Sequence, residues 1–217
     1  MKRFNMTVVA TIGASVAIAG CASGAGGGAV QVRNAAGSSV ESAAPAGQIA
    51  VGQGPTNYTV QTQPPAGSCQ YRYSNTGEPL PDPRCTPGAT NPKVTQDTLA
   101  NTICRSGYTK SIRPPVEITR AEKRSNAQSY SFTGDLKSAE FDHLLSLELG
   151  GDPNDPKNLW VEPPSPGHKP RDGVNNDKDI IENKLASAVC NGRVPLADAQ
   201  TAIATDWTTA LDRLGLR

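Results

Sequence analysis

The clearest pattern in the chain is the spacing of apolar residues in its last third. Over residues 175–189, Ile181, Leu185 and Ala188 lie three or four positions apart. A second stripe follows Pro195, a residue that is favoured in the first turn of a helix. Its members repeat at the same spacing, and they are Leu196, Ala199, Ile203, Trp207, Leu211 and Leu214. Both patterns predict amphipathic helices that pack against a common core.

The middle of the chain changes to a period of two. Within residues 141–149, Leu145, Leu147 and Leu149 occupy alternate positions, which is typical of a strand. A turn-rich segment with Gly, Asp and Pro follows at residues 150–156, and 158–161 reads as a second short strand. The predicted order is strand, turn, strand, loop (163–173) and helix, which indicates an α+β fold.

Two shorter helices are predicted upstream of this unit. Thr95 suits the N-cap of the first, where Leu99 and Ile103 lie one turn apart. Thr119 and Glu122 form a capping-box pattern that predicts a helix over residues 119–128. Residues 69–94 contain five prolines and are predicted to be loop-like.

The first twenty residues have the sequence pattern of a secretion signal. A short positive start is followed by an uncharged apolar run that is too short for a membrane span. The run ends in Ile18, Ala19, Gly20 and Cys21, which resembles a bacterial lipobox. The resemblance implies a lipoprotein signal peptide over residues 1–20 and a lipid on Cys21. Acyl chains such as palmitate contribute about 0.8 kcal/mol per buried CH₂, so the protein is expected to be exported and anchored to the cell membrane.

Glycine, alanine and serine make up half of residues 22–67, and only Arg33 and Glu41 are charged there. Such a segment buries too little apolar surface to offset the entropy of ordering it. We therefore expect residues 21–67 to be a flexible, disordered tether. The folded domain is expected to occupy residues 68–217.

Four cysteines remain in the predicted domain: Cys69, Cys85, Cys104 and Cys190. An even number in an exported chain predicts two disulfide bonds, for which three connectivities are possible. We favour a local Cys69–Cys85 loop and a long Cys104–Cys190 link. No pair has the close spacing of a zinc-binding motif.

Charge and composition exclude two classes of protein. The 217 residues carry a formal net charge of +1, so the chain lacks the positive excess of a histone-like nucleic-acid binder. It also lacks the several long apolar runs of a polytopic membrane protein.

Candidate chemistry gathers around one of the two histidines. His143 follows Asp142, and Asn158 comes fifteen residues later at the start of the second predicted strand. An imidazole with a pKa near 6.5 can accept a proton from water. A neighbouring carboxylate can hold a hard divalent cation, which stabilises a departing alkoxide.

These residues resemble the HNH (His-Asn-His) endonuclease motif. The resemblance rests on Asp142 and His143, on the Leu-x-Leu-Gly-Gly stretch at 147–151, and on Asn158 with Leu159. It implies a ββα-metal core, in which a two-stranded hairpin and a helix hold one metal, packed by additional helices.

A wider stretch, 95–207, also resembles a group of exported bacterial HNH-like proteins. Further matching pieces lie at 106–110, 113–115, 178–179 and 206–207. The resemblance implies that His143 is the general base and Asp142 a metal ligand. It also implies that Asn158 bonds the loop backbone and orients the imidazole.

The helix-borne third position of the motif departs from the family pattern. His168 lies in a proline-rich loop that cannot be helical. We favour Asn176 as the remaining metal ligand, with Asn175, Asp179 and His168 as alternatives. Oxygen ligands favour magnesium or manganese.

The sequence leaves the substrate surface open. Seven acids against two lysines over residues 135–162 suit a cation and repel bare phosphate. Basic residues elsewhere form either a phosphate-binding surface or an ordinary solvated helix face; they are Arg105, Lys110, Arg113, Arg120, Lys123 and Arg124. No motif for sequence-specific recognition is present.

Two functions are therefore predicted. The first is metal-dependent hydrolysis of nucleic-acid phosphodiester bonds, with DNA favoured over RNA as the partner. The alternative is a non-catalytic surface lipoprotein that uses the HNH-like fold as a binding module.

Overall fold

The computed structural model describes residues 49–168 and 176–217 of the chain. They belong to the compact unit Ser42–Arg217. The predicted signal peptide, Cys21, most of the predicted tether and Asn175 lie outside the described residues.

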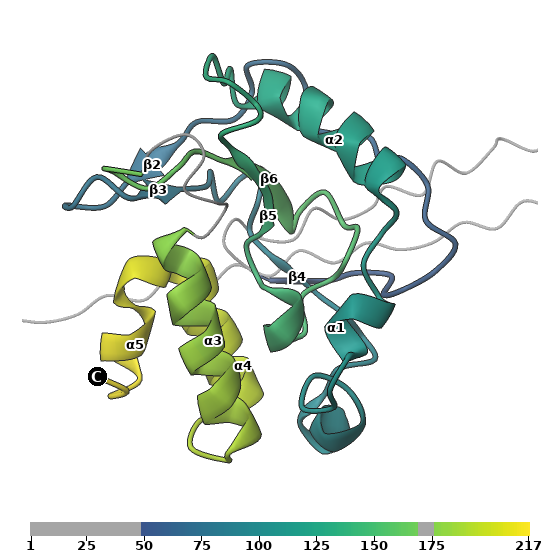
Figure 1. The fold of residues 1–217 in the computed structure, drawn as a ribbon, viewed down its shortest axis with the longest axis vertical. Coiled ribbons are helices and arrows are strands. Elements are labelled where there is room, and N and C mark those ends of the chain that lie inside the picture. The colour runs from purple at the N-terminus through teal and green to yellow at the C-terminus, as the bar shows by residue number, and fades with distance from the viewer. Residues whose placement is uncertain (1–48, 169–175) are drawn as a thin grey trace, which may run out of the picture. The chain divides into compact units, whose positions relative to one another are not determined.

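The described residues form an α+β fold in which small sheets and helices alternate (Figure 1). The strands are β1 (Ala50–Val51), β2 (Arg72–Tyr73), β3 (Pro79–Leu80), β4 (Ala89–Thr90), β5 (Glu140–His143) and β6 (Leu159–Glu162). The helices are α1 (Tyr108–Ser111), α2 (Val116–Ser129), α3 (Asp177–Cys190), α4 (Leu196–Asp206) and α5 (Ala210–Arg213). Three 3₁₀ helices accompany them: η1 (Gln96–Asn101), η2 (Leu147–Leu149) and η3 (Trp207–Thr209).

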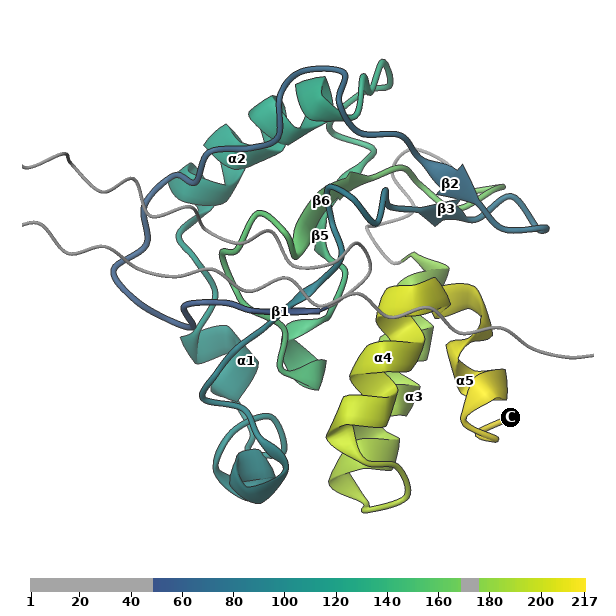
Figure 2. The same ribbon diagram turned by 180° about the vertical axis from the view of Figure 1, so that it is seen from behind.

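Strands β5 and β6 form the antiparallel pair that carries the site. Their register pairs Glu140 with Glu162 and Asp142 with Trp160. Paired residues share a face of a sheet and neighbours alternate, so these four side chains share one face, and Phe141 and Val161 lie on the other. Helix α2 packs against β6, and Phe141 and Val161 pack with Ala127 of that helix. Figures 1 and 2 show α3 and α4 running side by side.

The predicted long strand over 141–149 is wrong beyond His143. Strand β5 ends there, and the three alternating leucines fall in a buried turn that contains η2. The turn closes on itself, because the backbone amides of Leu149 and Gly151 both donate to the carbonyl of Ser146. Helices α3 and α4 cover it. Alternate leucines here reflect burial in a folded loop rather than a pleated strand.

The predicted capping box at Thr119 is also wrong. Helix α2 begins at Val116, with Pro115 at the N-cap, so Glu122 lies in the helix interior. There its carboxylate is buried and accepts a hydrogen bond from the Gln61 amide at 2.7 Å. Thr95 does precede a short helix, but the helix is the 3₁₀ helix η1, which ends before Ile103.

The two C-terminal helices match their predicted positions closely. Helix α3 starts two residues later than expected, and α4 follows Pro195. Their apolar stripes enter one core that also contains Leu145, Leu147 and Leu149. The second stripe continues through η3 and α5 rather than as one continuous helix.

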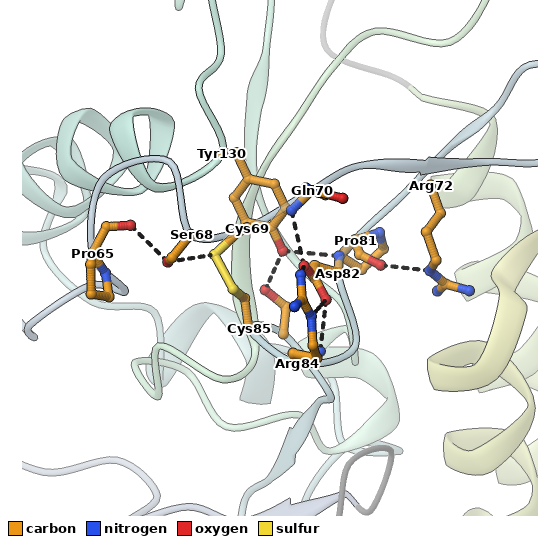
Figure 3. A network of polar contacts seen from close by, with 11 residues as sticks. Pro65, Ser68, Cys69, Gln70, Arg72, Pro81, Asp82, Arg84, Cys85 and Tyr130 are labelled. Carbon is orange, nitrogen blue, oxygen red and sulfur yellow. Dashed lines mark hydrogen bonds and ion pairs between the residues drawn. A yellow bond between two sulfur atoms is a disulfide. The ribbon is translucent and has the colours of Figure 1, made fainter.

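Both favoured disulfide bonds are confirmed. Cys69 bonds Cys85, and Cys104 bonds Cys190 at the end of α3. The first bond lies beside a loop held by polar contacts of Asp82 and Tyr130, which Figure 3 shows. Two disulfides fit an oxidising, extracytoplasmic compartment.

The predicted tether extends too far toward the domain. Within residues 49–67, β1 pairs in parallel with β4, and the Tyr58 hydroxyl donates to the Ile112 carbonyl at 2.5 Å. The Gly67 amide donates to the carbonyl of Gln128 in α2. These contacts make residues 49–67 part of the packed unit, because specific hydrogen bonds compensate for their small apolar surface. Within 49–168 and 176–217, no helix has the length and apolar character needed to cross a membrane.

Candidate functional site

A polar cavity of about 380 Å³ opens where β5 ends and α3 begins. Five carboxylates, one imidazole and one guanidinium line it, and they belong to Glu140, Asp142, Glu148, Asp179, Glu182, His143 and Arg113. The two residues at the centre of the predicted site, Asp142 and His143, therefore share one cavity. They do so although neighbours on a strand point to opposite faces, because His143 is the last residue of β5.

A buried lysine that the sequence analysis did not assign to the site lies directly behind the cavity wall. The side chain of Lys178 is 1% exposed, and its Nζ lies 2.8 Å from Oδ2 of Asp142. The same ammonium donates to the backbone carbonyl of His143 at 2.9 Å and pairs with Glu182 one helical turn along α3. Lys178 thus connects the end of β5 to the first turns of α3.

Asp142 has a second fixed contact on the same oxygen. The Trp160 indole N–H donates to Oδ2 at 3.1 Å, which is the cross-strand pairing that the hairpin register provides. Both contacts use Oδ2. Within the described residues Oδ1 makes no hydrogen bond.

The acids around Lys178, which we call the acid cluster, are Glu140, Asp142, Glu162, Asp179 and Glu182; if all were ionised, they would carry more negative charge than one ammonium can balance. Burial raises the pKa of Glu140 to about 8, and the charges of Asp142 and Asp179 add to the effect. Burial likewise raises the pKa of Glu182 to about 8 despite its contact with Lys178, and it raises the pKa of Glu162 well above the usual range. For Lys178 itself, burial lowers the pKa, but the surrounding carboxylates outweigh that effect and raise it. An environment of this kind favours an additional cation.

His143 is held in one tautomer by its ring contact. Its Nε2 lies 3.0 Å from the carbonyl oxygen of Pro153. A carbonyl can only accept, so Nε2 carries a proton, and in the neutral ring Nδ1 keeps its lone pair. Burial lowers the pKa of the imidazole, although the Pro153 carbonyl and Asp142 act in the opposite direction. The ring is therefore neutral, with no partner for Nδ1 among the residues that the structure describes.

Asn158 ties the loop between the strands to the hairpin. Its Oδ1 accepts from the Leu145 amide at 2.9 Å, and its Nδ2 donates to the carbonyls of Leu145 and Asp152 at 3.0 and 2.9 Å. Asp152 directly precedes Pro153, whose carbonyl holds the imidazole. These are the loop contacts that the resemblance implies for Asn158, whereas a role in catalysis stays a prediction.

The contact that the structure shows for Asn176 is with Glu140 of β5. Asn176 is the N-cap residue of α3, and its Nδ2 donates to Glu140 at 3.2 Å. The amide thus presents its donor to the acid cluster, and the role of Asn176 as a metal ligand stays a prediction. Of the alternatives, Asp179 lines the cavity, His168 does not, and Asn175 lies outside the described residues.

The donor chemistry of the cavity fits a hard divalent cation in part. Within residues 49–168 and 176–217, no three His, Cys, Asp or Glu side chains are gathered closely enough to hold a metal by themselves. Magnesium, however, needs only one or two carboxylates and keeps several waters. Asp142 and Glu140 on β5 and Asp179 on α3 supply carboxylates from both sides of the cavity, and a bound cation would favour their ionised forms.

Lys178, Glu182, Glu140 and Glu162 are the members of the cluster that the sequence analysis left without a role. The signals were present, since Lys178 and Glu182 are four apart on a helix and Glu140 and Asp142 are two apart on a strand. Comparisons with protein families, curated proteins and solved structures found no match to this chain.

Proposed function

We propose that this chain hydrolyses phosphodiester bonds of nucleic acid, with DNA favoured, in the cavity between β5 and α3. The observation that carries the proposal is the fixed tautomer of His143. A neutral imidazole with its proton on Nε2 and its lone pair on Nδ1 is in the state that a general base requires. In this proposal β5, β6 and α3 are the hairpin and helix of an HNH-like centre, and lipid on Cys21 anchors the exported protein.

The hydrolysis assigns a step to each residue. Nδ1 of His143 takes a proton from water as the water oxygen bonds to phosphorus, and the bond from phosphorus to the leaving sugar oxygen breaks. The Pro153 carbonyl stabilises the resulting imidazolium through Nε2–H. Asn158 keeps the loop that carries Pro153 in place, and Arg113, which lines the cavity, is positioned to bind a phosphate oxygen.

A magnesium or manganese ion held by Asp142, together with Glu140 or Asp179, would supply countercharge for the phosphate and for the leaving oxygen. The chain's own residues set where it would bind, because Oδ2 of Asp142 is engaged by Lys178 and Trp160. Oδ1 of Asp142 would then be the oxygen available to the ion.

One observation favours the alternative of a non-catalytic binding module. The predicted ligand Asp142 already has a cationic partner in Lys178 at 2.8 Å. This ion pair balances the charge of Asp142 without a metal ion.

A nicking assay separates the two proposals. The disulfide-intact protein is incubated with supercoiled plasmid and Mg²⁺ or Mn²⁺, beside His143→Ala and His168→Ala. We expect nicking by the wild type and a loss of about 10²- to 10⁴-fold in His143→Ala, the usual contribution of a general base. His168→Ala is the matched control, because His168 is the only other histidine and does not line the cavity.

Two outcomes would contradict the nuclease proposal. Equal nicking by wild type and His143→Ala would show that His143 is not the base. An absence of nicking by wild type with either metal would leave the binding module as the better account.

A further inference from the structure

We propose that Lys178 is the positioning residue of this site: its ammonium fixes His143 through the backbone carbonyl of that residue and joins it to Asp142 and α3. The inference deepens the proposed function and rests on it for its kinetic part. The geometric part concerns the folded protein alone.

The first argument is the match between donors and acceptors. An ammonium group has three N–H donors and no acceptor. Lys178 has three oxygen partners: Oδ2 of Asp142 at 2.8 Å, the His143 carbonyl at 2.9 Å, and the Glu182 carboxylate. Each donor therefore has one partner, and the position of the ammonium is fixed by groups from both β5 and α3.

The second argument is that both the backbone and the ring of His143 have a fixed hydrogen-bond partner. Lys178 holds its backbone carbonyl, and the Pro153 carbonyl holds its ring through Nε2. The ring contact depends on the loop that Asn158 stabilises, and the backbone contact depends on α3. Because β5 ends at His143, its carbonyl bond to Lys178 attaches this strand end to the helix.

The third argument is the cost of the arrangement. A fully buried lysine carries a large desolvation penalty, which a well-packed apolar side chain would avoid. Helix α3 already enters the core through Leu185, Ala188 and Val189. The buried charge therefore provides something that core packing does not, namely a fixed cation at the junction of the general base and the acid cluster.

A purely structural ion pair makes a different prediction. If Lys178 only neutralised Asp142, its replacement would lower stability and leave the tautomer of a folded His143 unchanged. The state of the His143 ring therefore distinguishes positioning from simple charge balance.

The test uses imidazole nitrogen NMR on the disulfide-intact protein without added metal. The chain has two histidines, so the spectrum contains two ring systems, and His168→Gln assigns them. For wild type we expect His143 in a single neutral form with Nε2 protonated. Lys178→Met keeps an unbranched side chain and removes the ammonium. In this variant we expect the chemical shifts of the two ring nitrogens to move toward values that average both tautomers.

The matched control is Lys184→Met, which makes the same substitution at an exposed lysine of α3 that does not line the cavity. We expect its His143 signals to match wild type. In the nicking assay, we expect kcat to fall about 10²-fold in Lys178→Met with KM little changed, the effect of misplacing a reacting group by about 1 Å. We expect kcat of Lys184→Met to stay within about threefold of wild type.

Two results would overturn the inference: a folded Lys178→Met with the wild-type His143 tautomer, or a Lys184→Met variant with the same NMR change as Lys178→Met. If Lys178→Met does not fold, Lys178→Arg decides, because a planar guanidinium keeps the charge but cannot reproduce three tetrahedral bonds. Wild-type His143 signals and kcat in Lys178→Arg would then reject positioning. A protein that never nicks DNA would refute the proposed function, and the NMR result would still decide the role of Lys178.

Discussion

Two ion pairs of the same length occupy very different places in this protein. Nη2 of Arg84 lies 2.8 Å from Oδ2 of Asp82, and Nζ of Lys178 lies 2.8 Å from Oδ2 of Asp142. The side chain of Arg84 is 64% exposed, whereas that of Lys178 is 1% exposed. The first pair joins residues two positions apart in one loop, and the second joins strand β5 to helix α3.

The Asp82–Arg84 pair, in which only the arginine is exposed, belongs to a loop that is held mainly by backbone groups. The Asp82 carboxylate accepts from the amides of Gln70 and Arg84 at 3.0 and 2.9 Å, beside the Cys69–Cys85 bond (Figure 3). The Asp82 amide donates to the Tyr130 hydroxyl at 3.2 Å. The Arg84 side chain therefore adds two more donors, Nε at 3.2 Å and Nη2 at 2.8 Å, to a carboxylate that already has two backbone donors.

The buried pair lacks such support from the backbone. Asp142 receives its hydrogen bonds from Lys178 and Trp160, and further buried acids surround them. Burying charge is costly, so the buried Asp142–Lys178 ion pair needs a different explanation from the Asp82–Arg84 ion pair. Asp82 stabilises a loop through its backbone donors, and the Asp142–Lys178 pair joins strand β5 to helix α3 at the wall of the cavity.

The largest expected effect is on the buried pair. Lys178→Met should lower the free energy of unfolding by about 3–5 kcal/mol at neutral pH, because it leaves Asp142 buried without its cation. Urea denaturation with the disulfides intact measures the loss. The double variant Lys178→Met/Asp142→Asn should recover part of it, since the unpaired charge is then removed. A loss below about 1 kcal/mol in the single variant would place this pair in the same class as an exposed one.

The contrast also explains which parts of the molecule the sequence could predict. Helices α3 and α4 were predicted because their apolar stripes are long and regular, and the disulfides because an even number of cysteines has few pairings. Asn158 was identified by its spacing from His143. Each of these signals is local or can be counted along the chain.

The missing parts depend on tertiary contacts. Lys178 and Glu182 have the spacing of an ordinary surface pair on a helix, and nothing local shows that β5 lies against them. Alternating leucines after His143 have the period of a strand. In the structure they lie in a turn that packs against α3 and α4. Asn176 is at the start of the helix as expected. Its amide contacts Glu140 of β5, and no local sequence pattern indicates that contact.

A smaller effect is expected at Asp82. Asp82→Ala should lower the free energy of unfolding at neutral pH by about 1–3 kcal/mol, because the amides of Gln70 and Arg84 lose a buried acceptor. Thermal or urea unfolding measures the change. A neutral result would show that water replaces the carboxylate at this loop.

The same carboxylate should give an acid-dependent signature. Burial acts to raise the pKa of Asp82, but hydrogen bonds from Arg84 and Gln70 outweigh it and lower the pKa below 3.8. A lowered pKa stabilises the fold above the unfolded value, and this stabilisation disappears as the pH falls through the folded value. The stability gap between wild type and Asp82→Asn should therefore shrink below about pH 4. A gap that stays constant down to pH 2 would contradict this account.

The smallest expected effect is at Arg84, the exposed partner of the first pair. Arg84→Gln should leave the urea midpoint close to wild type, because Asp82 keeps its backbone donors and exposed ion pairs contribute little. Any remaining difference should disappear in 1 M salt, where the Debye length is about 3 Å. Arg84→Gln should also leave the nicking rate unchanged, since Arg84 does not line the cavity. If it destabilised the protein as much as Lys178→Met does, burial could not be what separates the two ion pairs, and the argument that the Lys178 contacts serve the cavity would lose its physical basis.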